Sequence, residues 1–125
     1  MASTKKPQAY RPVTPREQLL QQAIAITTAD RNKSYGDPEN NFHNIAVYWS
    51  QHLTASTGIE ITVTPNDVAA MMMLMKLARL STNPLHTDSV LDVAGYAACA
   101  ADCIAAEQNK NRSTISGSNS ANSCN

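Results

Sequence analysis

The chain has 125 residues, with ten Lys and Arg balancing ten Asp and Glu, so its formal net charge is zero. A neutral chain without a long basic run disfavours generic nucleic-acid binding, and no apolar run predicts a membrane span or a secretory signal. We expect one cytoplasmic domain, with a flexible N-terminal segment over 1–13, a helical domain over 14–108 and a disordered tail over 109–125, which is rich in Ser and Asn.

The first predicted helix begins with a capping signal. Thr14 is a good N-cap, Pro15 is favoured at the first helical position, and Glu17 completes a capping box. Apolar residues then recur at helical spacing. We expect this helix to fade over 31–34 and to stop at Gly36, which can adopt a left-handed conformation.

The second predicted helix begins at Asp37-Pro38, which is again a cap followed by proline. Its apolar residues fall on one face: Phe42, Ile45, Ala46, Trp49 and Leu53. The segment 54–63 contains Gly58 and a β-branched alternation that resembles a short strand. Because a lone strand has no pairing partner in this sequence, we interpret the segment as an extended linker, with Ile59, Ile61 or Val63 covering one end of a bundle.

The third predicted helix begins at Thr64-Pro65, with Asp67 in the place of the capping-box Glu. It is apolar on nearly every face, which is typical of a central helix or of one that packs on both its own core and a partner subunit. A turn over 81–86 follows, in which Pro84 prevents the helix from continuing. A fourth helix, rich in alanine, runs from Thr87 or Asp88 to about residue 108. The sequence predicts an all-α, compact antiparallel four-helix bundle that forms a homo-oligomer.

Four charges stand out on the apolar hairpin made by the last two predicted helices. Lys76 and Arg79 share one helix face, and Asp88 and Asp92 share another, on which Tyr96 lies one turn further along. An antiparallel hairpin would bring the two pairs together. They could simply fix the helix register, or the carboxylates could hold a divalent cation while the cations bind phosphate. A helix N-cap would also explain Asp88.

A second polar cluster lies at the junction of the first two predicted helices. Arg31 and Lys33 suit the negative end of a helix dipole or a ligand phosphate, and Tyr35 could stack on a base. Asn41 lies near a helix N-terminus that offers free N–H groups to an anion. A simple turn satisfied by Asp and Asn side chains is the alternative. We interpret His43 as a polar surface residue.

These motifs together resemble a known family. R-N-K-S-Y-G-D-P-E-N-N-F, T-P-N-D-V, K-L-A-R-L-S-T-N-P and D-S-V-L-D-V-A-G-Y-A-A, within residues 29–102, are similar to a helical domain family of unknown function that is common in phages and prophages. More distantly, the Lys76 helix and the stretch from Asp92 to Tyr96 resemble phage nucleotide-modification-associated domains and the MazG-type all-α nucleotide pyrophosphohydrolases.

The MazG resemblance implies a four-helix core that dimerises or tetramerises and holds Mg²⁺ or Mn²⁺ on helix carboxylates, where the metal binds a nucleoside triphosphate. Asp92 would match the last residue of that family's E-x-x-D motif, and Asp88 stands one residue further away than the expected Glu. The family's E-x-x-E motif is absent, and residues 40–55 contain no acidic side chain.

Three functions therefore remain open. The first is a magnesium-dependent nucleoside triphosphate pyrophosphohydrolase, with Asp88 and Asp92 on the metal and Lys76 and Arg79 on phosphate. The second is a non-catalytic oligomer that binds a nucleotide or sequesters a nucleotide-derived signal, with no need for a metal. The third is a small structural or interaction protein whose charges only set the helix register.

Overall fold

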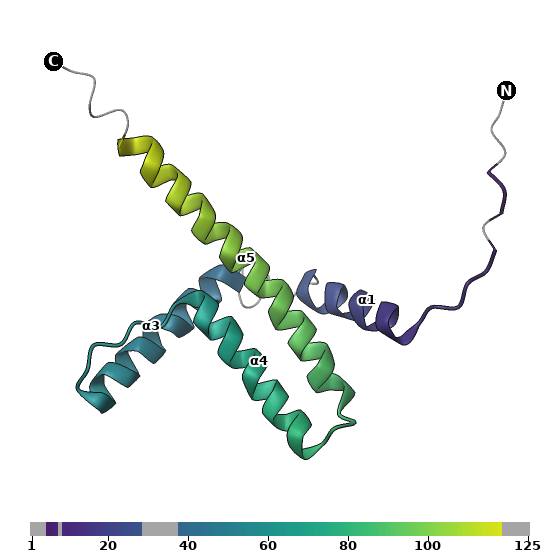
Figure 1. Ribbon diagram of the computed structural model, residues 1–125, viewed down its shortest axis with the longest axis horizontal. Coiled ribbons are helices and arrows are strands. Elements are labelled where there is room, and N and C mark those ends of the chain that lie inside the picture. Colours follow the sequence, from purple (N-terminus) through teal and green to yellow (C-terminus); the bar gives the residue numbers. More distant parts are fainter. Residues whose placement is uncertain (1–4, 8, 29–37, 119–125) are drawn as a thin grey trace.

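The computed structural model describes residues 5–7, 9–28 and 38–118, and this part of the chain contains helices and no strand (Figure 1). The prediction of an all-α protein is confirmed, and the described residues contain four helices. The helices are α1 (Pro15–Thr28), α3 (Pro38–Thr57), α4 (Pro65–Thr82) and α5 (Thr87–Ser118).

The predicted capping boxes are present at the starts of α1 and α4. The backbone N–H of Thr14 donates to Glu17 over 2.8 Å, and the Glu17 N–H donates back to the Thr14 hydroxyl over 3.3 Å. The same exchange joins Thr64 and Asp67, at 2.8 and 3.1 Å. These exchanges satisfy N–H groups that a helix start otherwise leaves unpaired. The N–H bond from Thr64 lowers the pKa of Asp67.

The helix α5 is longer than the sequence predicted. We expected it to end near residue 108 and the chain to be disordered from 109, whereas the structure continues the helix through Ser118. The side chains of 109–117 are exposed, as their composition predicts. Extending an existing helix adds one hydrogen bond per residue without a new nucleation cost, so the helix can continue past the part that packs against other helices. Residues 119–125 lie outside the described residues.

The linker between α3 and α4 is extended, although α3 continues further into the predicted loop, to Thr57. The Ser50 hydroxyl accepts the N–H of Val63 at 2.8 Å, and the Thr54 hydroxyl accepts the N–H of Ile61 at 3.0 Å. Helix side chains thus take the place of a partner strand. Val63 packs against the core as predicted, but Ile59 is 66% exposed and covers nothing.

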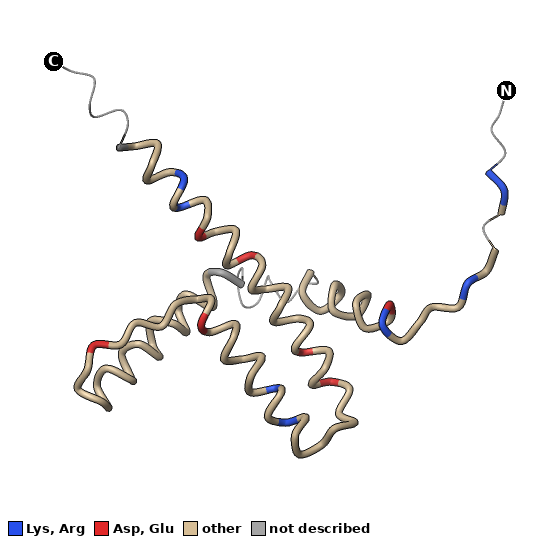
Figure 2. Tube along the Cα trace, viewed as in Figure 1, with Lys and Arg blue, Asp and Glu red and all other residues tan. Residues whose placement is uncertain are grey.

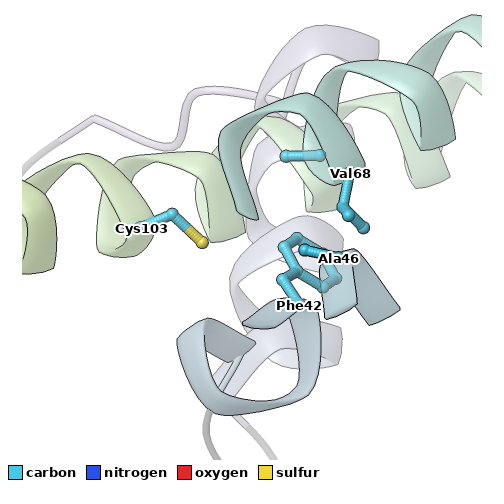
Figure 3. Close-up of a cluster of buried hydrophobic side chains, with 5 residues drawn as sticks. Phe42, Ala46, Val68 and Cys103 are labelled. Atoms are coloured by element: carbon cyan, nitrogen blue, oxygen red, sulfur yellow. The ribbon is translucent and has the colours of Figure 1, made fainter. Parts of the chain in front are cut away.

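The buried core lies where α3, α4 and α5 meet (Figure 3). Its members are small apart from one aromatic ring: Phe42, Ala46, Val68, Ala69 and Cys103. Partly buried residues surround this cluster, among them Trp49 and Met72. The core is therefore narrow and is made of few large side chains.

The helices are arranged more openly than the compact bundle we predicted. The helices α4 and α5 form an antiparallel hairpin and α3 packs on both of them, but α1 contacts only α5 among the described helices (Figure 1). A Cβ on Gly95 would lie 3.3 Å from the Cδ1 of Ile26, so α1 makes a close approach there. Large hydrophobic side chains stay exposed on α1, α4 and α5.

One helix in the described part of the chain is long and apolar enough to cross a membrane, contrary to our reading of the sequence. This segment, Thr87–Gly117, has a mean hydropathy of 1.4 over its most apolar window. The same segment supplies the contacts of α5 with each of the other three helices. Length and composition alone therefore do not separate a membrane span from the central helix of this fold.

Candidate functional site

A buried ion pair joins α4 to α5. The Nζ of Lys76 lies 2.7 Å from Oδ2 of Asp92. Lys76 is only 9% exposed, whereas the Asp92 side chain keeps 36% of its exposure. Figure 2 shows the basic stretch of α4 beside the acidic start of α5. The predicted approach of these charges is thus confirmed for this pair.

Helical spacing accounts for the position of each partner. Lys76 is seven residues after Ala69 and eight after Val68, so it falls on the inner face of α4 that those residues bury. Asp92 lies between Ser89 and Tyr96 on one face of α5. The antiparallel turn sets these two faces against each other. Because the pair lies at the edge of the core, the Asp92 side chain is well exposed, whereas the Lys76 side chain keeps only 11% of its exposure.

The turn before α5 is held by a cap that the sequence did not reveal. The Ser89 hydroxyl lies 2.8 Å from Nδ1 of His86, and the Ser89 N–H donates to the same nitrogen at 3.2 Å. Ser89 is fully buried. Asp88, for which we had considered an N-cap role, is instead exposed in the first turn of the helix. An imidazole is a less common cap than Ser, Thr, Asp or Asn, and only the His-x-x-Ser spacing could have pointed to it.

The other predicted ligand residues are spread over the surface and the core. The Tyr96 ring packs on Phe42, with centroids 6.3 Å apart, so it supports the core beside the ion pair. Asn41 is half-buried near the start of α3, and Arg79 is exposed near the end of α4. The structure thus brings Lys76 and Asp92 together, and Tyr96 lies one turn further along α5, against the core. The remaining predicted ligands, Arg31, Lys33 and Tyr35, lie outside the described residues.

The described residues do not fit a divalent cation. Within 5–7, 9–28 and 38–118, no group of three His, Cys, Asp or Glu side chains converges as metal ligands would. One oxygen of Asp92 is already held by an ammonium group, and Asp88 is exposed. Mg²⁺ and Mn²⁺ need several oxygen ligands around one point. We therefore derive no chemical step through a metal at this pair.

A thiol nucleophile is not supported next to the pair either. Burial, together with the negative charge of Asp102, raises the pKa of the Cys99 thiol. A raised pKa keeps the thiol protonated, and the thiol is a weaker nucleophile than the thiolate. Cys99 packs at the edge of the core, where it acts as a small apolar side chain.

Two open cavities beside the start of α4 were not predicted. One, of about 660 Å³, lies between α3 and the extended linker. The other, of about 420 Å³, reaches α5 and is lined by Asn40, Asn66, Glu107 and Lys110 among others. His43 lines both, in keeping with the exposed, polar position that we predicted for it. The cap-proline signals mark where each helix begins, but no signal in the sequence indicates that these segments lie close together in space.

Comparison with known proteins identifies the family. Residues 18–104 match the model of a family described as a domain of unknown function, DUF6378. The chain belongs to this family. The match contains the α4–α5 hairpin and both partners of the buried ion pair, and it ends before the exposed extension of α5.

Relatives of this DUF6378 chain occur in mycobacteriophages. It is 41% identical over 83 residues to the gene 55 protein of Mycobacterium phage D29, covering 66% of this chain and 51% of that protein. It is 42% identical over 79 residues to the gene 55 protein of Mycobacterium phage L5, covering 63% and 47%. The chain thus spans about half the length of these relatives, and neither name describes an activity. No solved structure matches the chain.

Proposed function

We propose that this DUF6378 domain is a phage nucleotide-handling protein that binds a nucleotide or a nucleotide-derived molecule, with its site at the Lys76–Asp92 pair. The ammonium group of Lys76 would bind a ligand phosphate. The exposed part of the Asp92 carboxylate would accept a hydrogen bond from a ligand N–H or hydroxyl. The sequence resemblance supports the class of ligand, and the phage relatives support the setting.

The observation that carries this proposal is the burial of Lys76. A lysine is rarely buried unless it is paired, and a buried ion pair is often no more stabilising than apolar residues of the same volume. Fold stability alone is therefore a weak reason for a lysine at 9% exposure on an otherwise apolar helix. A ligand that shares the charge is a stronger reason, because the pair is accessible to solvent from its Asp92 side.

Binding is favoured over hydrolysis by the small number of carboxylates. Hydrolysis of a triphosphate through metals requires several acidic side chains around the phosphates. Asp92 is the one carboxylate of the described chain that is paired with a buried cation. A phosphate can be bound by cations and N–H groups without any metal.

The test is a panel of nucleoside mono-, di- and triphosphates added to the full chain, with and without Mg²⁺ or Mn²⁺. Thermal shift and pyrophosphate release are recorded together. We expect a shift that persists in a chelator, without turnover. Pyrophosphate release that requires metal and is lost in Asp92→Asn would replace binding by hydrolysis. No shift with any nucleotide would leave the pair as a device that fixes the hairpin register.

Matched variants separate the site from general charge effects. Asp92→Asn and Lys76→Met should each lower the apparent affinity for the nucleotide, measured by thermal shift, at least tenfold. Asp102→Asn and Lys110→Met remove the same charges from exposed positions of α5, so they should leave the shift unchanged. Equal losses in all four variants would indicate nonspecific attraction of the anion rather than a site.

A further inference from the structure

We propose that the outward face of α4 is the contact surface between two copies of this chain. We define the outer stripe as the residues that lie opposite the face that carries Lys76: Ala70, Met71, Leu74, Leu77 and Ala78. Their spacing of three and four residues places them on one side of the helix. This proposal is independent of the nucleotide site, which lies on the inner side.

The charge distribution of α4 is inverted for a helix at a protein surface. A surface helix normally turns its charges to water and its apolar stripe to the core. Here Lys76 points inward and is buried, whereas Leu74 is 61% exposed, Leu77 49% and Met71 42%. The five residues of the outer stripe are uncharged. The exposed Asp67 lies on the same face one turn before Met71, where the Thr64 cap holds its carboxylate, and Arg79 lies on the Lys76 side. Figure 2 shows the long uncharged stretch of α4.

The composition of the outer stripe is typical of a protein interface rather than of a surface that stays exposed to solvent. The centres of protein interfaces are depleted of charged residues and enriched in methionine. Isolated exposed apolar residues are ordinary, but a contiguous row of them marks an interaction site. The alternation of three and four residues also matches the seam of a helix pair, in which side chains interlock along the contact.

A second copy is the occupant that these observations favour. A two-fold contact sets each residue against the same surface of the partner, so a charge near its centre would face its own copy. The uncharged stripe around Leu74 avoids that repulsion. The monomer's own core is narrow, built mainly from alanine and other small side chains. Burial against a copy would supply the apolar contacts that the core lacks, and a copy is present wherever the chain is made.

The length of the outer stripe predicts a dimer of intermediate stability. A helix of 18 residues is about 27 Å long, and one such pair lies at or below the ~1,200 Å² lower end of stable interfaces. We therefore expect a dimer that dissociates on dilution within a measurable range, not one that is permanent. A membrane is the less favoured occupant, because α5 packs beside α4 and carries the acidic side chains Asp88, Asp92, Asp102 and Glu107, which anionic lipid would repel.

The experiment measures the mass of the full chain in detergent-free buffer by light scattering and by sedimentation, over a hundredfold range of concentration. We expect twice the mass of one chain at the top of the range and a falling mean mass on dilution. The thermal midpoint should also rise by several degrees for each tenfold increase in concentration, because folding is coupled to association. A single-chain mass and a constant midpoint at every concentration would overturn the proposal.

Two variants locate the contact. Leu74→Glu should reduce the mass to that of one chain at concentrations where the natural chain is paired. Leu20→Glu makes the same change at a residue of α1 with similar exposure, 58%, and should leave the pairing intact. If Leu74→Glu loses its helical circular dichroism, the proposal is judged from how the mass and thermal midpoint of the natural chain change with concentration. A Leu74→Glu chain that still pairs, or a single chain that sediments with phosphatidylglycerol vesicles, would contradict the proposed surface.

Discussion

Lys76 and Asp92 join the two helices of the hairpin through a contact of 2.7 Å, in which the lysine side chain is far less exposed than the aspartate side chain. The asymmetry matters for energetics. Removing the carboxylate would leave an ammonium group buried without its ion-pair partner, whereas removing the lysine would leave a carboxylate that water can still reach. The two single substitutions should therefore not cost the same.

We expect Asp92→Asn to lower the free energy of unfolding by about 1–3 kcal/mol, and Lys76→Met to lower it by less than half of that, because Met fills the apolar position. The double variant Lys76→Met with Asp92→Leu should come within about 1 kcal/mol of the natural chain. Urea unfolding at one protein concentration measures all three. A double variant less stable than Asp92→Asn alone would contradict the pairing, because removal of both charges should relieve the unpaired ammonium group.

The second prediction concerns Ser50, which holds the extended linker against α3. Its hydroxyl accepts the N–H of Val63 at 2.8 Å and donates to the carbonyl oxygen of Ala46 at 2.7 Å. Ser50→Ala leaves a part-buried N–H without its acceptor, at a cost of about 1–3 kcal/mol. Ser56→Ala is the matched control, because the exposed Ser56 hydroxyl donates only to Leu53 in its own helix. Its effect should stay within about 0.5 kcal/mol. Equal effects would mean that the linker does not depend on this bond.

The features that follow from local sequence were predictable. The capping boxes at Thr14 and Thr64 could be recognised because the interacting residues are three apart. The pairing of Lys76 with Asp92 could be anticipated because a short turn forces two helices to be antiparallel. In each case the residues that interact are close in sequence or lie on two helices joined by one short turn.

The features that depend on distant contacts were not predictable. The sequence did not reveal which of the four hairpin charges would be buried, because that depends on the rotation of α4 against the core formed with α3. It also did not reveal that Ser50 would replace a partner strand for Val63. The packing of α1 on α5 includes a close approach of Ile26 to Gly95, and a single glycine among many alanines gives no signal of its own.

The third prediction concerns the close contact between Ile26 and Gly95. A Cβ on Gly95 would lie 3.3 Å from the tip of Ile26. Because the Ile26 tip can turn aside, Gly95→Ala should be nearly neutral, with the gain of up to about 1 kcal/mol in helix propensity offsetting the crowding. Gly95→Leu has no room and should detach α1 from α5. Limited trypsin digestion at Arg16 would then be faster by an order of magnitude or more.

The control for this substitution lies on the same helix. A Cβ on Gly117 meets no heavy atom within 4 Å, so Gly117→Leu should leave the digestion of α1 unchanged. Rapid digestion of the natural chain at Arg16, at the rate of the Gly95→Leu variant, would contradict a stable contact between α1 and α5.

The last prediction follows from the cap of α4. The Thr64 N–H, and then the Thr64 hydroxyl, lower the pKa of Asp67 from its ordinary 3.8. A carboxyl group whose pKa is depressed by folding stabilises the protein above its unfolded pKa, and that stabilisation is lost as the pH falls through the folded pKa. The destabilisation caused by Asp67→Ala should therefore be largest near neutral pH and should shrink from about pH 4 downward.

Urea unfolding at pH 7, 4 and 3 tests this expectation against Asp102→Ala, which removes an exposed carboxylate in the middle of α5. Thr64→Ala should cost about 1 kcal/mol at neutral pH. It should keep most of the acid dependence, because the backbone N–H, the larger cause of the pKa shift, stays in place. Asp67→Ala could instead lower the free energy of unfolding equally at all three pH values. That result would mean that the cap depends on the size or polarity of the Asp67 side chain and not on its negative charge.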